Sequence, residues 1–346
     1  MTDSILAISL LWGFVFIYAV MATMDFGAGF WSMVYINREK TNATNIANRY
    51  LSPTWEVTNV FIVAIVVALV TFFPGATFTL GTVLLIPGSI ILLFLSIRSG
   101  FLVFSHAVKD YEKPLTYVSG ISGFLIPCLL ITILPITHGD YIVNVNGVDQ
   151  LHLTKLITSP HIYAFMSFAF FSTLFLSSLL LADYSNEARE KEAFIIYRRD
   201  AMITGPLSLV SAFFILITMK TEATWLYEKM ISHSTLLIIS VSMFLVAGIA
   251  LYDPFKRAKG DKKGWPRLAV IAIVAQYLIA SYVYGISHLP YIVYPTITIE
   301  SGFTHPNTFR ALFTTYIVGF LILFPGFFYF WRLFMKDKRY VRNSNK

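Results

Sequence analysis

Long apolar runs constrain this chain more than any other feature. Stretches of about twenty mostly apolar residues recur from one end of the sequence to the other. A helix of that length crosses the ~30 Å hydrocarbon core of a bilayer, and it satisfies its own backbone hydrogen bonds there. Charged residues make up only 13% of the 346 residues, against about 25% in soluble domains. The sequence therefore predicts an all-α integral membrane protein.

The apolar runs predict nine transmembrane helices in a single polytopic membrane domain that comprises residues 1–346. Pro74-Gly75 supplies a turn between the second and third runs, which would otherwise form one helix about twice as long as a bilayer is thick. The predicted helices lie near Ile5–Met33, Trp55–Phe73, Thr79–Phe104, Leu115–Ile136, Pro160–Leu181, Met202–Met219, Ser234–Leu251, Leu268–Leu289 and Phe309–Phe330.

The basic residues predict the orientation of these helices. Short cytoplasmic loops are enriched in Lys and Arg. If the N-terminus is outside and the C-terminus cytoplasmic, the outer segments hold only Lys155, Lys220, Lys229 and Arg310. Arg98 lies within a span, and all the others of the 26 Lys and Arg residues fall in cytoplasmic segments. The net charge of +7 is thus a topology signal, and it indicates no nucleic-acid partner.

Two acidic residues lie in or beside the first two apolar runs. An acid at the centre of a membrane helix costs ~2.5–3.5 kcal/mol even on the most lenient scale, which suggests a functional reason to keep it. Asp25 and Glu56 both approach from the cytoplasmic side on spans joined by one loop. Two such carboxylates could pass protons inward by exchanging them with bound water. Gly27 and Gly29 would let another helix come close to Asp25.

Structural explanations exist for the same charges. Glu56 follows Ser52-Pro53-Thr54, and an acid in the first turn of a helix gains about 0.3–1 kcal/mol from the macrodipole. Asp25 could be a hydrogen-bonded structural aspartate. Arg98 could extend its long stem towards the inner membrane surface. These alternatives stay open at the level of sequence.

The histidines and the single cysteine indicate no metal or haem site within this chain. The seven histidines are scattered, mostly at predicted span ends or in loops, and none has the spacing of a helical metal site. We therefore expect them to be hydrated single residues. Cys128 lies alone in an apolar run, which excludes an intrachain disulfide.

Two motifs resemble those of a known family. MDFGAGFW at 24–31 resembles an Asp-x-Gly-x-Gly element, and SPTWEVTN at 52–59 resembles a Pro-x-Trp-(Asp/Glu) element, both from subunit II of the cytochrome bd-type quinol oxidases. Arg98 with Gly100, the nine-helix pattern and the 294–334 segment add to the resemblance, which covers the whole chain. It implies two four-helix bundles plus one peripheral helix.

The resemblance also implies a function in the bacterial cytoplasmic membrane. Quinol oxidation and dioxygen reduction would occur on a partner, the haem-bearing subunit I, which would hold haem b and haem d. Asp25 and Glu56 match carboxylates associated with a proton route, and Trp55, Asn59 and Arg98 would support that route or the subunit interface. A small single-helix accessory subunit, membrane lipid and a structural quinone are further expected partners.

The sequence departs from the family at two positions. Ala22 and Met21 stand where some members carry a second aspartate, so a proton route would need water or another residue there. Phe61 stands where one member has a Trp in an oxygen path, which argues against an oxygen path here.

Two other function classes compete with an oxidase subunit. One is an ion-coupled secondary transporter, although nine spans do not divide into the inverted repeats typical of that class. The other is a purely structural assembly subunit, in which both carboxylates pair with polar groups.

Overall fold

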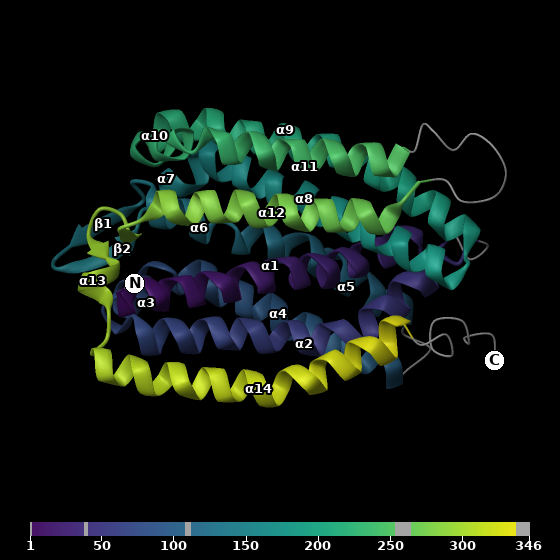
Figure 1. Cartoon of the computed structure of the whole chain (residues 1–346), viewed down its shortest axis with the longest axis horizontal. Helices are drawn as coiled ribbons and strands as arrows, with labels where there is room; N and C mark the ends of the chain where they lie inside the picture. The colour runs from purple at the N-terminus through teal and green to yellow at the C-terminus, as the bar shows by residue number, and fades with distance from the viewer. Residues whose placement is uncertain (1, 38–40, 108–111, 253–263, 337–346) are drawn as a thin grey trace.

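The chain forms a bundle of long helices that run side by side along one axis (Figure 1). The computed structural model describes residues 2–37, 41–107, 112–252 and 264–336; within these, the side chains of 51–56, 105–107, 112, 327, 330–331 and 333–336 are not described. We call the end of the bundle where α1 begins the amino-terminal end, and the end where α1 finishes the Tyr35 end.

The long elements are helices interrupted by short turns. In chain order they are α1 (Asp3–Tyr35), α2 (Ala43–Phe72), α3 (Pro74–Val83), α4 (Leu85–Ala107), α5 (Glu112–Leu130), α6 (Ile133–His138), α8 (Pro160–Ala188), α9 (Lys191–Glu222), α10 (Thr224–Ser232), α11 (Ser234–Tyr252), α12 (Pro266–His288) and α14 (Pro306–Lys336).

Short elements gather at the amino-terminal end (Figure 1). They are the antiparallel hairpin β1 (Ile142–Val145) and β2 (Val148–Leu151), helix α7 (Leu153–Thr158), the antiparallel pair β3 (Tyr291–Val293) and β4 (Ile297–Thr298), and helix α13 (Ile299–Gly302). The backbones of α3 and α13 meet there. A Cβ built on Gly75 would lie 2.9 Å from the Cα of Gly302, so this approach requires glycine.

Helix α1 occupies the middle of the bundle. It packs against α2 and α5 on one side and against α8 on the other. Helices α4 and α5 pack together, as do α8 with α9 and α11 with α12. Helix α14 lies along one edge (Figure 1) and contacts α1 and α2 mainly through residues 309–320.

Eight of the described helices are long and apolar enough to cross a membrane. The described side chains of α2 from Val57 to Phe72 form a shorter apolar helix. The predicted helical membrane fold is therefore confirmed, whereas the count of nine crossings and their orientation stay predictions.

Several predicted helix boundaries are wrong. Helix α2 starts at Ala43, not near Trp55, and α9 starts at Lys191, not at Met202. The predicted third helix is two helices, because the chain breaks at Leu84. An apolar window marks only the part of a helix that suits lipid, while polar residues extend the same helix beyond it.

Candidate functional site

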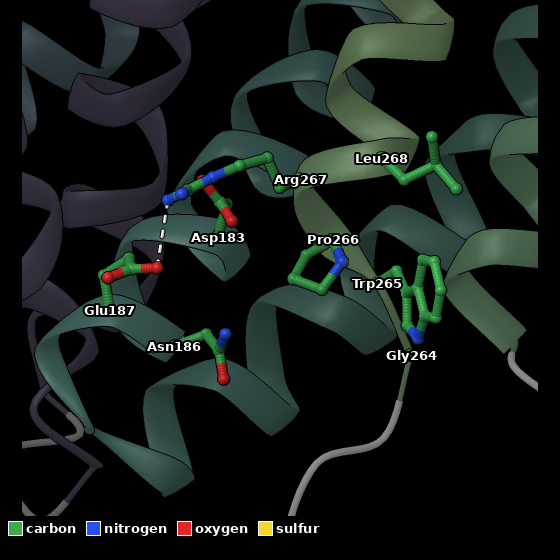
Figure 2. Close-up of a pocket in the computed structure, with 8 residues that line it drawn as sticks. All are labelled: Asp183, Asn186, Glu187, Gly264, Trp265, Pro266, Arg267 and Leu268. Carbon is green, nitrogen blue, oxygen red and sulfur yellow. Dashed lines mark hydrogen bonds and ion pairs between the residues drawn. The ribbon is translucent and has the colours of Figure 1, made fainter. Parts of the chain in front are cut away.

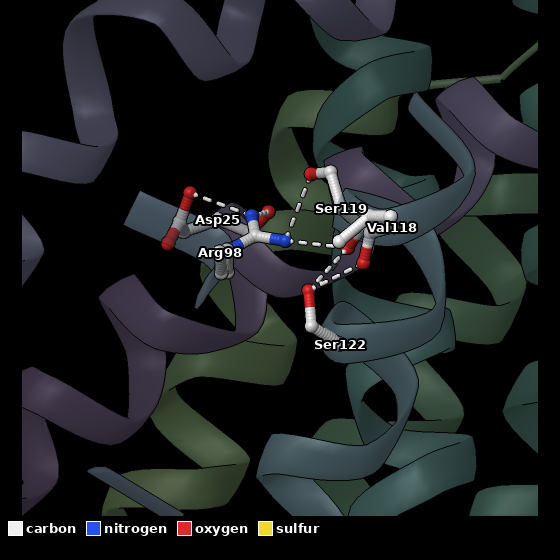
Figure 3. Close-up of polar contacts among 5 residues, drawn as sticks. All are labelled: Asp25, Arg98, Val118, Ser119 and Ser122. Atoms are coloured by element: carbon white, nitrogen blue, oxygen red, sulfur yellow. Dashed lines mark hydrogen bonds and ion pairs between the residues drawn. The ribbon is translucent and has the colours of Figure 1, made fainter. Parts of the chain in front are cut away.

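A buried ion pair joins α1 to α4 in the middle of the first span (Figure 3). Arg98 Nη2 donates to Asp25 Oδ1 at 3.1 Å and to the carbonyl oxygen of Asp25 at 2.9 Å. The two side chains are 2% and 5% exposed. Because isolated charges are very costly in lipid, each group makes the other tolerable there.

Arg98 is also held by groups that carry no charge. Its Nη1 donates to the carbonyl oxygen of Ser119 at 2.7 Å and to Ser119 Oγ at 3.0 Å, both on α5. The guanidinium carbon lies 5.1 Å from the centre of the Phe26 ring. The alternative that Arg98 extends towards the membrane surface is therefore wrong, since its partners hold it inside the bundle.

The two glycines of the first motif serve different contacts. A Cβ on Gly29 would lie 2.9 Å from Arg98 Nη1 and 3.0 Å from Ser119 Oγ, so Gly29 makes room for the ion pair. A Cβ on Gly27 would overlap Ser177 of α8. Ser177 Oγ in turn accepts a hydrogen bond from Trp31 Nε1 at 3.0 Å. Gly27 therefore allows α8, rather than the ion pair, to approach α1.

The second predicted carboxylate lies on α2. The side chains of Trp55 and Glu56 lie outside the described residues, while Asn59 is partly exposed. Because α2 starts at Ala43, position 56 lies about 20 Å along the helix, which excludes the explanation that Glu56 is a first-turn acid.

The register of α1 and α2 places position 56 near the depth of Asp25. Ser32 Oγ on α1 donates to Asn48 Oδ1 on α2 at 2.6 Å, which sets these two residues opposite each other. The two helices run in opposite directions (Figure 1) and have the same rise per residue. With Asn48 opposite Ser32, position 56, eight residues after Asn48, would lie opposite residue 24, eight residues before Ser32. Thr44 Oγ1 also donates to the carbonyl oxygen of Ser32, at 3.3 Å, and this pairing would set position 56 opposite residue 20 instead. Position 56 therefore lies within roughly 8 Å of the depth of Asp25 along the bundle.

A second buried acid lies at the Tyr35 end. Tyr35 OH on α1 donates to Asp200 Oδ2 on α9 at 2.5 Å. Arg199 Nη2 donates to Asp200 Oδ1 at 3.0 Å, and the Arg199 side chain is 53% exposed. Tyr197 OH donates to the carbonyl oxygen of Ala43 and fixes the start of α2 beside this cluster. Asp200 does not stand out in the sequence, because it lies in a charged stretch before the apolar run.

Histidines from distant segments meet in the amino-terminal half of the bundle. His138 Nε2 lies 2.9 Å from His161 Nε2, and His138 Nδ1 lies 2.8 Å from Tyr284 OH. His161 Nδ1 lies 2.8 Å from Thr218 Oγ1, and the rings of His138 and His288 are 6.2 Å apart. The expectation of separate, hydrated histidines is wrong for His138 and His161, which are 1% and 0% exposed.

One arrangement of protons satisfies this whole histidine network with neutral groups. Tyr284 OH donates to His138, His138 Nε2–H donates to His161, and His161 Nδ1–H donates to Thr218. Thr218 Oγ1 donates to the carbonyl oxygen of Phe214 at 2.9 Å, which ends the series. The network therefore needs no charge and no ligand to be complete.

An acid and a tyrosine lie beside the histidine network. Glu222 Oε2 accepts hydrogen bonds from Tyr141 OH at 2.5 Å and from Ser159 Oγ at 2.7 Å. Tyr141 lies outside the spans. Burial, and then the hydrogen bond to the Glu222 carboxylate, raise the pKa of the Tyr141 phenol above its ordinary value.

A shallow pocket lies at the Tyr35 end, between α8 and the start of α12 (Figure 2). Arg267 donates there to Asp183 Oδ2 at 3.3 Å and to Glu187 Oε1 at 3.0 Å. The Arg267 and Glu187 side chains are 59% and 49% exposed, so these ion pairs contribute little to stability.

Within the described ranges, no three His, Cys, Asp or Glu side chains are grouped so that they could hold a metal ion. His138 and His161 use both ring nitrogens in hydrogen bonds. Neither residue offers a free nitrogen to a haem iron in this arrangement.

Comparisons with known proteins agree with one another. Residues 4–334 match the family model of the cytochrome bd terminal oxidase subunit II. A protein of Bacillus subtilis (strain 168), provisionally named cytochrome bd menaquinol oxidase subunit II, is 63% identical over 343 residues, which cover 99% of each chain. A chain of the bd oxidase from Geobacillus thermodenitrificans has 32% identity and a TM-score of 0.80, with 97% of this chain and 100% of that chain covered.

Proposed function

This chain belongs to the cytochrome bd terminal oxidase subunit II family, and from that premise we propose that it conducts protons to a haem-bearing partner. It is a multi-pass membrane protein and a subunit of an oxidoreductase complex. The partner, subunit I, would bind haem b and haem d, which carry electrons from quinol to dioxygen. The name of the Bacillus subtilis relative supports menaquinol as the quinol.

We propose that the chain crosses the membrane nine times in two four-helix bundles with α14 at the periphery. The amino-terminal end faces outside and the Tyr35 end faces the cytoplasm. The distribution of Lys and Arg supports this orientation. In this proposal the subunit also stabilises subunit I, because its long apolar helices can pack against the helices of a partner within the membrane.

Asp25 and Glu56 carry the protons in this proposal. A carboxylate accepts a proton from water on one side and releases it to water on the other, so that charge moves without any redox change. The observation that carries the proposal is the buried Asp25–Arg98 pair, with position 56 near its depth on the neighbouring helix.

Arg98 suits a carboxylate that gains and loses a proton. When Asp25 is protonated, the guanidinium keeps three neutral acceptors: the carbonyl oxygens of Asp25 and Ser119, and Ser119 Oγ. The arginine therefore stays in place and hydrogen-bonded in both states of the acid.

The test uses Glu56→Gln and Asp25→Asn in the complete oxidase. We expect each variant to slow oxygen consumption by about 10²-fold or more, since a positioned proton carrier contributes roughly that much. The haem absorption spectrum should stay unchanged. Glu300→Gln, which removes an exposed acid from α13, is the matched control and should have normal turnover.

Each rival function class predicts a different result. Normal turnover in both variants, with haem retained, would leave the subunit as a scaffold and refute proton conduction. A secondary transporter would purify without a haem-containing partner. The family match already favours the oxidase over that class.

A further inference from the structure

The depth of the two carboxylates raises a question about how protons reach them. Asp25 lies ten residues before Tyr35, about 15 Å from the Tyr35 end, and position 56 is no closer to that end. A route that contains only these two acids therefore has no described connection to the cytoplasm. The inference below rests on the proposed function and supplies that connection.

One face of α1 carries polar groups over this distance. At 100° per residue, Asp25, Ser32 and Tyr35 fall within about 80° of the helix circumference. All three are buried, at 4%, 1% and 3% exposure, although polar side chains in a membrane helix are costly without a reason. Gly29 lies on the same side, with Arg98 and Ser119 against it.

At the Tyr35 end, this face of α1 contacts Asp200, an acid that lies close to the protein surface. Asp200 accepts from Tyr35 OH and from Arg199, and it is 5% exposed itself while Arg199 is half exposed. The half-exposed Arg199 side chain, which pairs with Asp200, therefore links this buried carboxylate to the cytoplasmic surface. Its hydrogen bond to Tyr35 connects it directly to α1.

The middle of the face contains further hydrogen-bonding groups. Ser32 Oγ bonds to Asn48 one turn from Tyr35, and Ser119 Oγ lies beside Gly29 one turn further on. Arg98 Nε is buried, and among the described residues it has no hydrogen-bond partner. An unsatisfied buried donor costs about 1–3 kcal/mol, which water bound next to Asp25 would remove.

We propose that Asp200 is the cytoplasmic entry of the proton route, and that the hydroxyl groups of Tyr35 and Ser32 and water bound at Arg98 Nε lead from it to Asp25. Protons enter at the Asp200 carboxylate and move along α1 through hydroxyl groups and water. No bond other than O–H is made or broken, and each group returns to its starting state after one proton has passed.

The test measures proton uptake by the complete two-subunit oxidase in vesicles with a pH-sensitive dye. Asp200→Asn should slow proton uptake and oxygen consumption by about tenfold, less than the loss expected at Asp25, because water can partly bypass the entry. Asp200→Glu should restore both rates. A role limited to folding would not separate Asn from Glu in this way, and haem content should be equal in all variants.

Two further variants keep the result interpretable. Asp183→Asn removes another partly buried acid at the same end, outside the α1 face, and should leave proton uptake unchanged. Tyr35→Phe removes only the hydroxyl and keeps the Arg199–Asp200 pair, so it should slow uptake even if Asp200→Asn fails to assemble.

The outcomes separate this inference from the proposed function. Normal proton uptake in Asp200→Asn and Tyr35→Phe, together with slow turnover in Asp25→Asn, would refute Asp200 as the entry site. The proposed route through Asp25 and Glu56 would still stand. Normal rates in all three would overturn both.

Discussion

Two buried polar networks lie in different halves of this bundle, and they satisfy the same membrane constraint in opposite ways. The network around Asp25 and Arg98 contains two formal charges that neutralise each other. The network around His138 and His161 consists of neutral groups and ends at a backbone carbonyl. Both pair most of their polar groups inside the bundle, but only the first holds a carboxylate that can change its charge while the neighbouring arginine stays bonded. Burial alone is therefore a poor guide to function.

The largest effect should come from breaking the charged network. Arg98→Met, which keeps the volume of the side chain, leaves the Asp25 carboxylate unpaired and should destabilise the complex by about 3–5 kcal/mol. Thermal unfolding of the purified complex measures this loss.

A double variant separates stability from function in the same network. Asp25→Leu combined with Arg98→Met removes both charges and should regain most of the lost stability, because replacing a buried ion pair with apolar groups is often neutral. Oxygen consumption should remain low. A double variant that is as unstable as Arg98→Met would contradict this view of the pair.

A smaller effect is expected in the neutral network. Thr218→Val removes the acceptor of His161 Nδ1–H and should cost about 1–3 kcal/mol in unfolding free energy, with turnover per haem unchanged. Thr221→Val, one turn away and exposed, is the control and should have almost no effect. Slow turnover in Thr218→Val would show that the histidine network also serves the reaction.

The smallest effect concerns Tyr141 and depends on pH. The folded-state pKa of Tyr141 is raised, so the stability from its neutral phenol is present below the unfolded value of about 10 and is lost as the pH rises through the folded value. Unfolding measured from about pH 8 to 11 should show stability falling above about pH 10.

Tyr141→Phe should lessen that decline and cost about 1 kcal/mol at neutral pH, since its hydrogen bond to Glu222 is lost. Tyr163→Phe, which removes the hydroxyl of an exposed tyrosine, should keep the alkaline decline. An unchanged pH dependence in Tyr141→Phe would mean that another group controls it.

The sequence predicted the features that depend on local composition. Apolar runs identified the membrane helices, and the cost of charge in lipid identified Asp25 and drew attention to Arg98. It did not predict that these two residues pair, because they are 73 positions apart and their contact depends on how α1, α4 and α5 pack. The motif itself gave the family, which the comparisons confirm.

The missed residues share a physical reason. His138, His161 and Tyr284 have no common periodicity, so no single helix pattern could reveal their cluster. Asp200 lies among charged residues, a pattern that predicts a solvent-exposed segment. An acid exposed to water needs no functional explanation, so the sequence does not indicate a site there. Only the fold, in which Tyr35 of α1 reaches α9, shows that its carboxylate is buried.

The close approach of Gly75 to Gly302 bears on how the last helix is secured. It clamps the segment before α14 to α3 at the amino-terminal end, and Thr304 N adds a hydrogen bond to the carbonyl oxygen of Phe72. Among the described side chains of α14, ring contacts with α1 extend to Phe320, and residues 321–326 are exposed. A larger side chain at Gly75 would therefore push the Gly302 backbone away from α3 and displace the segment that leads into α14.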